Sequence, residues 1–126
     1  MWINPLHPEF IALANDGGGQ ISKEGGTHWS EQNNQPTAQF YRVQTDNSEP
    51  FRIYAAQQDN STIRIPHRTE SHAIGQTDWE PTAGGASGHI AIDPQDPNIV
   101  YGGSYGGYLS RYDHKRNLSL NVHVWP

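Results

Sequence analysis

The chain lacks cysteine, has few basic residues and contains no long apolar run. Without cysteine it has neither a disulfide framework nor a thiolate metal site. Eight Lys and Arg stand against thirteen Asp and Glu, a formal net charge of −5, so no basic surface is expected to meet nucleic-acid phosphates. No run approaches the ~20 apolar residues of a membrane span, so no membrane partner is expected. The N-terminus shows no signal peptide, and the localisation stays unknown.

Helical patterning is also missing, because no stretch of eleven or more residues places apolar side chains at i, i+3 and i+4. The chain is rich instead in residues of turns and strands: thirteen Gly, nine Pro, four Trp, six Tyr and three Phe. A length of 126 residues is ordinarily one domain. The composition therefore predicts a single all-β domain with many turns.

Three internal repeats begin at Asn4, Asp46 and Asp93. In each repeat a Pro follows four residues later and a β-branched residue seven residues later. The starts lie 42 and 47 residues apart, a spacing typical of the blades of a β-propeller. The pattern predicts three four-stranded antiparallel blades, at approximately residues 1–32, 39–80 and 89–125.

Each repeat is expected to supply four strands. In the first these are Trp2–Ile3, Phe10–Ala14, Gln20–Ser22 and Thr27–Glu31. In the second they are Gln39–Thr45, Arg52–Gln57, Thr62–Pro66 and Thr77–Glu80. In the third they are His89–Ile92, Ile99–Gly103, Tyr108–Tyr112 and Leu118–Trp125. The segments at 33–38 and 81–88 are linkers by composition.

A Gly-rich turn follows the third strand of the first repeat. Ser22-x-Glu24-Gly25-Gly26-x-x-Trp29 resembles the Asp-box (BNR) repeat, S-x-D-x-G-x-x-W, in which an acidic side chain caps the turn and the Trp packs beneath it. Glu24 stands here where Asp is usual. The later repeats carry Arg64 and Arg111 where the box Ser would stand.

Further motifs follow in the same order as in that family: Asn15-Asp16-Gly17-Gly18, Gln39-Phe40-Tyr41, Gln58-Asp59-Asn60 and Asp93-Pro94-x-Asp96-Pro97-Asn98. Together they resemble the sortilin-like, "BNR-repeat glycosyl hydrolase" group of Asp-box β-propellers over nearly the whole chain. The resemblance implies a propeller fold and a parent family that is often secreted or extracytoplasmic. This chain is similar to three blades of a larger ring.

Alternate loops of such blades reach one face, which gathers polar and aromatic side chains of the kind that bind sugars. The expected ligand-binding residues are Asp16, Gln39, Tyr41, Gln58, Asp59, His89 and Tyr105, with Gln35 on the linker. The function expected is a non-catalytic binding or interaction module with carbohydrate as the candidate ligand class. No cofactor is expected.

Two alternatives remain open. Asp16-x-Gly18-Gly19 resembles a segment that carries a catalytic Asp in Asp-box xyloglucan hydrolases, and Asp59 stands at a nearly equivalent place in the next blade. The two would form the paired carboxylates of a glycoside hydrolase, unless both only form turns. The other alternative is a truncated or mobile open reading frame with a purely structural role.

Metal binding is the weaker interpretation of two acidic or histidine-bearing segments. His67, Glu70 and His72 fit no zinc spacing and are interpreted as a solvated insertion. The loops of Asp46, Asp93 and Asp96 suit calcium through their carboxylates, but Asx turns are the preferred interpretation.

Three blades leave apolar faces open at both ends, and such patches do not persist on soluble monomers. Propellers usually close with four to eight blades. Two copies supply six, so the chain is expected to form a homodimer in which blade three of each copy packs on blade one of the other.

Overall fold

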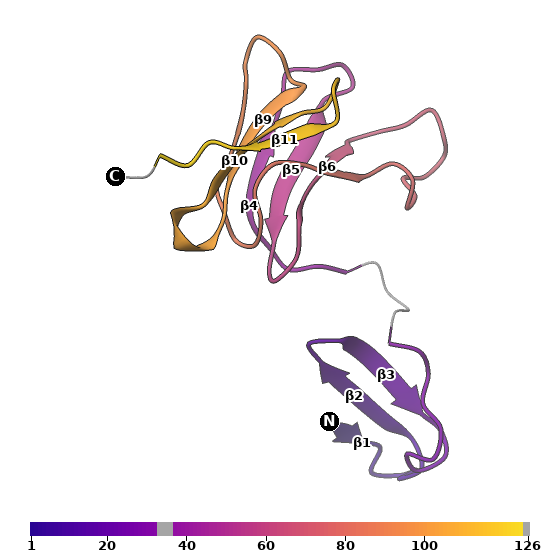
Figure 1. Cartoon of the computed structure of the whole chain (residues 1–126). Coiled ribbons are helices and arrows are strands. Elements are labelled where there is room, and N and C mark those ends of the chain that lie inside the picture. The colour runs from indigo at the N-terminus through magenta and orange to yellow at the C-terminus, as the bar shows by residue number, and fades with distance from the viewer. Residues whose placement is uncertain (33–36, 125–126) are drawn as a thin grey trace. The chain divides into compact units, whose positions relative to one another are not determined.

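The computed structural model describes residues 1–32 and 37–124, and it is built of strands (Figure 1). In this part of the chain the only helical element is one turn of 3-10 helix, η1 (Tyr105–Gly107), and no helix is long and apolar enough to cross a membrane. Three antiparallel sheets, of three, four and four strands, confirm the prediction of an all-β chain. The chain divides into two compact units, unit 1 (Met1–Thr37) and unit 2 (Ala38–Pro126), and each is described by itself.

Unit 1 holds sheet 1, in the order β1 (Trp2–Ile3), β2 (Ile11–Asn15) and β3 (Gly18–Ser22). The fourth strand predicted over Thr27–Glu31 is wrong. At Ser30 the backbone N–H donates to Ile21 O at 2.9 Å, but the acceptor for the Ile21 N–H is the Ser30 hydroxyl at 3.0 Å. Because a side chain takes the place of the backbone acceptor, the ladder does not continue.

Unit 2 holds two four-stranded sheets. Sheet 2 has the order β4 (Phe40–Thr45), β5 (Arg52–Gln57), β6 (Thr62–Pro66) and β7 (Glu80–Pro81). Sheet 3 has the order β8 (Ile90–Ile92), β9 (Ile99–Gly103), β10 (Leu109–Asp113) and β11 (Leu118–Asn121). The outer strands differ most from expectation, since β7 starts three residues late and β11 ends at Asn121. Trp125 lies outside the described residues.

The three repeats share one hydrogen-bonding register, as the spacing of Asn4, Asp46 and Asp93 predicts. In each, the N–H of this first residue donates to the carbonyl six residues later, at 3.0–3.2 Å: Asn4 to Phe10, Asp46 to Arg52 and Asp93 to Ile99. A second hydrogen bond also recurs, from the N–H of the residue 21 positions after the repeat start to the carbonyl of the residue five positions after the repeat start. The pairs are Gly25 to Glu9, His67 to Phe51 and His114 to Asn98. Each repeat therefore builds the same first hairpin and returns its chain to the same point.

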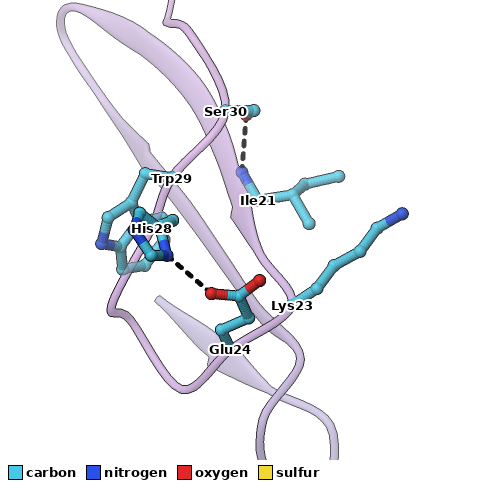
Figure 2. Close-up of a pocket in the computed structure, with 6 residues that line it drawn as sticks. All are labelled: Ile21, Lys23, Glu24, His28, Trp29 and Ser30. Carbon is cyan, nitrogen blue, oxygen red and sulfur yellow. Dashed lines mark hydrogen bonds and ion pairs between the residues drawn. The ribbon is translucent and has the colours of Figure 1, made fainter.

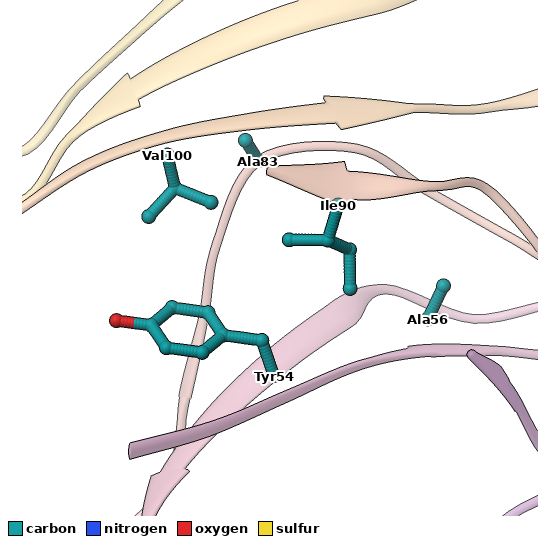
Figure 3. Packing of buried hydrophobic residues seen from close by; sticks show 5 residues of the cluster. All are labelled: Tyr54, Ala56, Ala83, Ile90 and Val100. Carbon is teal, nitrogen blue, oxygen red and sulfur yellow. The ribbon is translucent and has the colours of Figure 1, made fainter. Parts of the chain in front are cut away.

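The core of unit 2 lies between sheets 2 and 3, which pack face to face (Figure 3). Tyr54 and Ala56 of β5 meet Ile90 of β8, Val100 of β9 and the linker residue Ala83. Tyr54, Ala56 and Val100 are fully buried. Sheet 1 differs, because of the described residues of unit 1 Ser22 alone is buried.

The linker predicted at 81–88 begins after Pro81, the last residue of β7, and residues 82–88 pack between the sheets instead of forming a plain loop. Thr82 and Ala83 are buried, and the Gly85 N–H donates to Gly103 O at 3.0 Å. A Cβ on Gly102 would overlap the Ala83 carbonyl, so only glycine lets the linker backbone approach β9 this closely. The linker thereby fixes the ends of both sheets at which the predicted ligand residues stand.

Candidate ligand-binding face

Asp59 and Tyr105 come from loops of different sheets and meet side chain to side chain. Asp59 lies in the turn between β5 and β6, with φ of 51°, a value Asp tolerates better than most residues. Tyr105 opens η1 between β9 and β10. Its hydroxyl donates to Asp59 Oδ1 at 3.3 Å, and its side chain remains 59% exposed. The expectation that these two loops share one end of the sheets is confirmed.

A second contact on this end joins the first strand of sheet 2, β4, and the residue before it to the same turn. The Tyr41 hydroxyl donates to Gln58 Oε1, and the Gln58 N–H donates to Gln39 O at 2.8 Å. Tyr41 is 47% exposed. Gln39 and Tyr41 thus flank the turn that carries Asp59, and the Tyr41 ring is open to solvent.

His89 stands just before β8 and is exposed. Its carbonyl accepts the Gly103 N–H at 2.8 Å, two residues before Tyr105. Unit 2 therefore brings six predicted ligand residues to one end of its two sheets: Gln39, Tyr41, Gln58, Asp59, His89 and Tyr105. We call these six residues the amide–tyrosine face.

Asp16, the remaining predicted residue, belongs to unit 1. It forms the hairpin turn between β2 and β3 with Gly17, whose N–H donates to Asn15 Oδ1 at 2.8 Å. Gly18 follows with φ of 128°, and a Cβ there would lie 2.7 Å from the Gln32 carbonyl oxygen. The turn-forming role of Asp16 is thus visible, and its pairing with Asp59 stays a prediction. Gln35 lies outside the described residues.

The Asp-box-like turn of unit 1 corrects the expected role of Glu24. Ser22 Oγ accepts the N–H groups of both Glu24 and Gly26, at 3.3 and 2.9 Å. The Glu24 carboxylate instead lies 2.6 Å from His28 Nδ1. Glu24 therefore binds His28 instead of capping the turn, and the buried Ser22 hydroxyl holds the turn.

Trp29 contacts this turn, as expected of a box Trp, but it is not buried. Its Nε1–H donates to Gly26 O at 2.9 Å, and the side chain stays 36% exposed. Trp29 is one of six residues that line an open hollow of about 360 Å³. Figure 2 draws them: Ile21, Lys23, Glu24, His28, Trp29 and Ser30.

The loops weighed for calcium form Asx turns. Asp46 Oδ1 accepts the N–H groups of Ser48 and Arg52, and Asp93 Oδ1 accepts those of Gln95 and Asp96. Asp96 Oδ1 accepts the Asn98 N–H. The equivalent residue of the first repeat, Asn4, was not weighed for calcium and forms the same turn, with its Oδ1 accepting the Leu6 and His7 N–H groups. Across residues 1–32 and 37–124, no three His, Asp or Glu side chains gather where they could hold a metal ion.

A polar cluster between sheets 2 and 3, in which Arg64 and His114 are buried and Glu80 is about half exposed, is not predicted by the sequence. Arg64 donates from Nε and Nη2 to Glu80 Oε1 at 2.7 and 2.6 Å. His114 Nε2 lies 2.8 Å from Thr82 Oγ1, and its Nδ1 lies 3.8 Å from Glu80 Oε2. Burial, helped by the nearby Arg64 guanidinium, lowers the pKa of His114 to about 4. The contacts of Glu80 with Arg64 of β6 and with His114, which follows β10, join the two sheets.

Tyr54 adds a second polar contact to this interface. Its hydroxyl donates to Asp46 Oδ2 at 2.9 Å and lies 3.4 Å from Pro97 O of sheet 3's first loop. Burial and the Asp46 carboxylate raise the pKa of Tyr54 to about 12, so the hydroxyl keeps its proton at neutral pH.

Comparison with protein-family models, with curated proteins and with solved structures gave no match. The resemblance to Asp-box propellers therefore stays a prediction that rests on the residues quoted above.

Proposed function

We propose that the chain is a non-catalytic binding module made of Asp-box β-propeller blades, with a carbohydrate as its ligand. The observation that carries the proposal is the contact between Tyr105 and Asp59, which joins two exposed side chains from equivalent regions of adjacent repeats. It supports a surface formed by two sheets together, on which one ligand can touch both.

The chemistry of the amide–tyrosine face suits a neutral sugar. Tyr41 and Tyr105 offer exposed aromatic rings, against which the apolar face of a pyranose can pack. Gln39, Gln58 and Asp59 offer amide and carboxylate groups for sugar hydroxyls. Asp59 is the one carboxylate among the six residues. The hydrolase alternative needs a second acid about 5 to 10 Å away, and its candidate, Asp16, belongs to the other unit.

We further propose that the module assembles as a homodimer that completes a ring of six blades. Exposed apolar residues remain on the sheets of both units, among them Trp2 and Ile3 in unit 1 and Tyr101 and Leu120 in unit 2. Burying them against a second copy removes apolar surface from water, which favours association.

Glycan-array screening followed by calorimetry tests the ligand proposal. For a neutral glycan found on the array, Asp59→Asn should weaken binding about tenfold, because one charge-assisted hydrogen bond to a sugar hydroxyl is lost. Tyr105→Ala should weaken glycan binding at least as much, because the aromatic ring on which the sugar packs is removed. Asp16→Asn, alone and with Asp59→Asn, tests whether unit 1 shares the ligand.

Glu70→Gln serves as the control, since Glu70 is an exposed carboxylate in the β6–β7 connection and should leave affinity unchanged. Unchanged affinity in both Asp59→Asn and Tyr105→Ala would place the ligand elsewhere. Turnover of aryl glycosides that is lost in Asp59→Asn would favour the hydrolase instead.

A further inference from the structure

Sheet 2 shows how one repeat is covered by the next. Tyr54 of β5 and Arg64 of β6 stand directly opposite each other in the strand register. Both are buried against sheet 3, with 0% and 5% of their surfaces exposed. Val100 of β9 packs against Tyr54 from the covering side, and Ile92 of β8, paired with Val100, packs at its edge.

Sheet 3 carries the same pair of residues on its other face. Tyr101 and Arg111 stand eight and eighteen residues after Asp93, as Tyr54 and Arg64 stand after Asp46. They too are directly opposite each other in the register, and Leu120 of β11 is the next neighbour of Arg111. The face of sheet 3 that alternates with the buried Val100 and Ser110 also carries Ile99 and Asp113, which are buried at its edge. We define the open face of sheet 3 by the other side chains on it: Tyr101, Leu109, Arg111, Leu118 and Leu120.

This open face is exposed where its counterpart on sheet 2 is covered. Its four apolar side chains are 37–44% exposed: Tyr101, Leu109, Leu118 and Leu120. Tyr101 is thus exposed where Tyr54 is buried, Arg111 is only partly buried where Arg64 is buried, and three leucines lie around them. Because the open face of sheet 3 resembles the face of sheet 2 that sheet 3 covers, it is suited to a partner surface that resembles the covering face of sheet 3.

We propose that the open face of sheet 3 binds a second copy of this chain through the face of sheet 1 that carries Ile3 and Ile11. This inference rests on the proposed self-association and specifies its contact. In the existing interface the covering pair is Ile92 and Val100, which are partners across β8 and β9. Ile3 and Ile11 are partners across β1 and β2 at the same repeat positions.

Sheet 1 fits this role better than the outer face of sheet 2. The equivalent pair in sheet 2 is Thr45 and Ile53, in which one apolar side chain is replaced by a polar one. In sheet 1 both residues are Ile, and Ile3 is 46% exposed. Pro8, four residues after Asn4, also corresponds to Pro97, whose carbonyl lies 3.4 Å from the Tyr54 hydroxyl. The Pro8 carbonyl of a second copy would therefore meet the Tyr101 hydroxyl as the Pro97 carbonyl meets the Tyr54 hydroxyl.

Disulfide trapping tests this contact cleanly because the chain has no cysteine of its own. Two preparations, Ile11→Cys and Tyr101→Cys, are mixed and oxidised, and the linked dimer is read on a non-reducing gel. These positions are equivalent to Val100 and Tyr54, which pack together in the core of unit 2. The linked species should form at least tenfold faster than from Ile53→Cys mixed with Tyr101→Cys.

A second variant guards against a cysteine that harms folding. Leu120→Arg on the open face should raise the dissociation constant of the dimer at least tenfold, with the circular dichroism spectrum unchanged. Ile74→Arg is the matched control, since Ile74 is similarly exposed, at 42%, in the β6–β7 connection, and it should leave the dimer intact.

The outcomes separate the contact from self-association itself. A dimer by light scattering that is trapped through Ile53→Cys, or that Leu120→Arg leaves unchanged, overturns this contact and leaves self-association standing. A folded monomer overturns both. Loss of glycan binding with the dimer unchanged would overturn the ligand proposal and would leave both the contact and self-association standing.

Discussion

Tyr54→Ala is expected to lower the free energy of unfolding by about 4 kcal/mol. The Tyr54 ring is fully buried between sheets 2 and 3, where Ala56, Ile90 and Val100 surround it (Figure 3). Its removal takes away apolar contact and leaves a cavity at the only place where these two sheets share a buried apolar cluster among the described residues. Urea unfolding followed by Trp fluorescence measures the change.

Tyr54→Phe is the matched control, because it keeps the ring and removes only the hydroxyl. That hydroxyl donates to the Asp46 carboxylate at 2.9 Å, so its loss should cost about 1 to 2 kcal/mol. If both variants lose the same amount, the hydrogen bond from the hydroxyl, and not the packing of the ring, accounts for the stabilisation by Tyr54. If Tyr54→Ala loses less than about 1 kcal/mol, the face-to-face packing of sheets 2 and 3 is contradicted.

Acidification is expected to destabilise unit 2 through His114. The pKa of this imidazole is lowered from 6.5 to about 4, so the folded chain keeps it neutral while the unfolded chain protonates it first. The stabilisation is therefore complete above pH 6.5 and is lost as the pH falls from 6.5 towards 4. By pH 5 the loss should reach about 2 kcal/mol relative to pH 8. The groups around it are Arg64, Glu80, Arg52, Asp113, Thr82 and Tyr112.

His114→Gln tests the origin of this slope, because glutamine can still bond to Thr82 but does not titrate. The variant should flatten the stability profile between pH 8 and pH 5, whatever its stability at pH 8. NMR titration should place the pKa of His114 near 4 in the folded protein. A His114 that titrates near 6.5, with an unchanged slope in the variant, would show that the imidazole is not enclosed between the sheets.

The sequence was sufficient to predict the framework of each repeat. The position of Asn4, Asp46 and Asp93 matters because each side-chain oxygen binds two backbone N–H groups of its own loop, and this fixes the first hairpin. β-branched residues seven positions later then pair at one register in all three sheets. The spacing of these residues alone is therefore enough to predict the first hairpin of each repeat.

Side-chain competition set the limits of that prediction. The Ser30 hydroxyl accepts a backbone N–H of β3, and the predicted fourth strand does not form there. The Ser22 hydroxyl accepts two N–H groups of the next turn, which Glu24 was expected to cap. Arg64 and His114 are partners through Glu80, and nothing in their spacing marks a cluster that forms between two sheets. The linker at 82–88 looked like a loop because its glycines, needed for close approach to β9, also suit turns.

The candidate face was predicted in part. Asp59 and Tyr105, and likewise Tyr41 and Gln58, were placed at the same end of the blades from loop alternation, and the structure joins each pair by a hydrogen bond. The alternation of loops along the chain predicts which loops lie at the same end of a sheet. It does not predict how the chain divides into compact units. Asp16, assigned to the same face, belongs to the other unit, and its role there stays a prediction.

The size of the native chain in solution tests the central claim most directly, because the claim is that a second copy covers the apolar faces that three repeats leave exposed. Multi-angle light scattering at micromolar concentration should give a mass of about twice the 14.1 kDa chain, with a β-type circular dichroism spectrum. A stable monomer of 14.1 kDa with the same spectrum would contradict it.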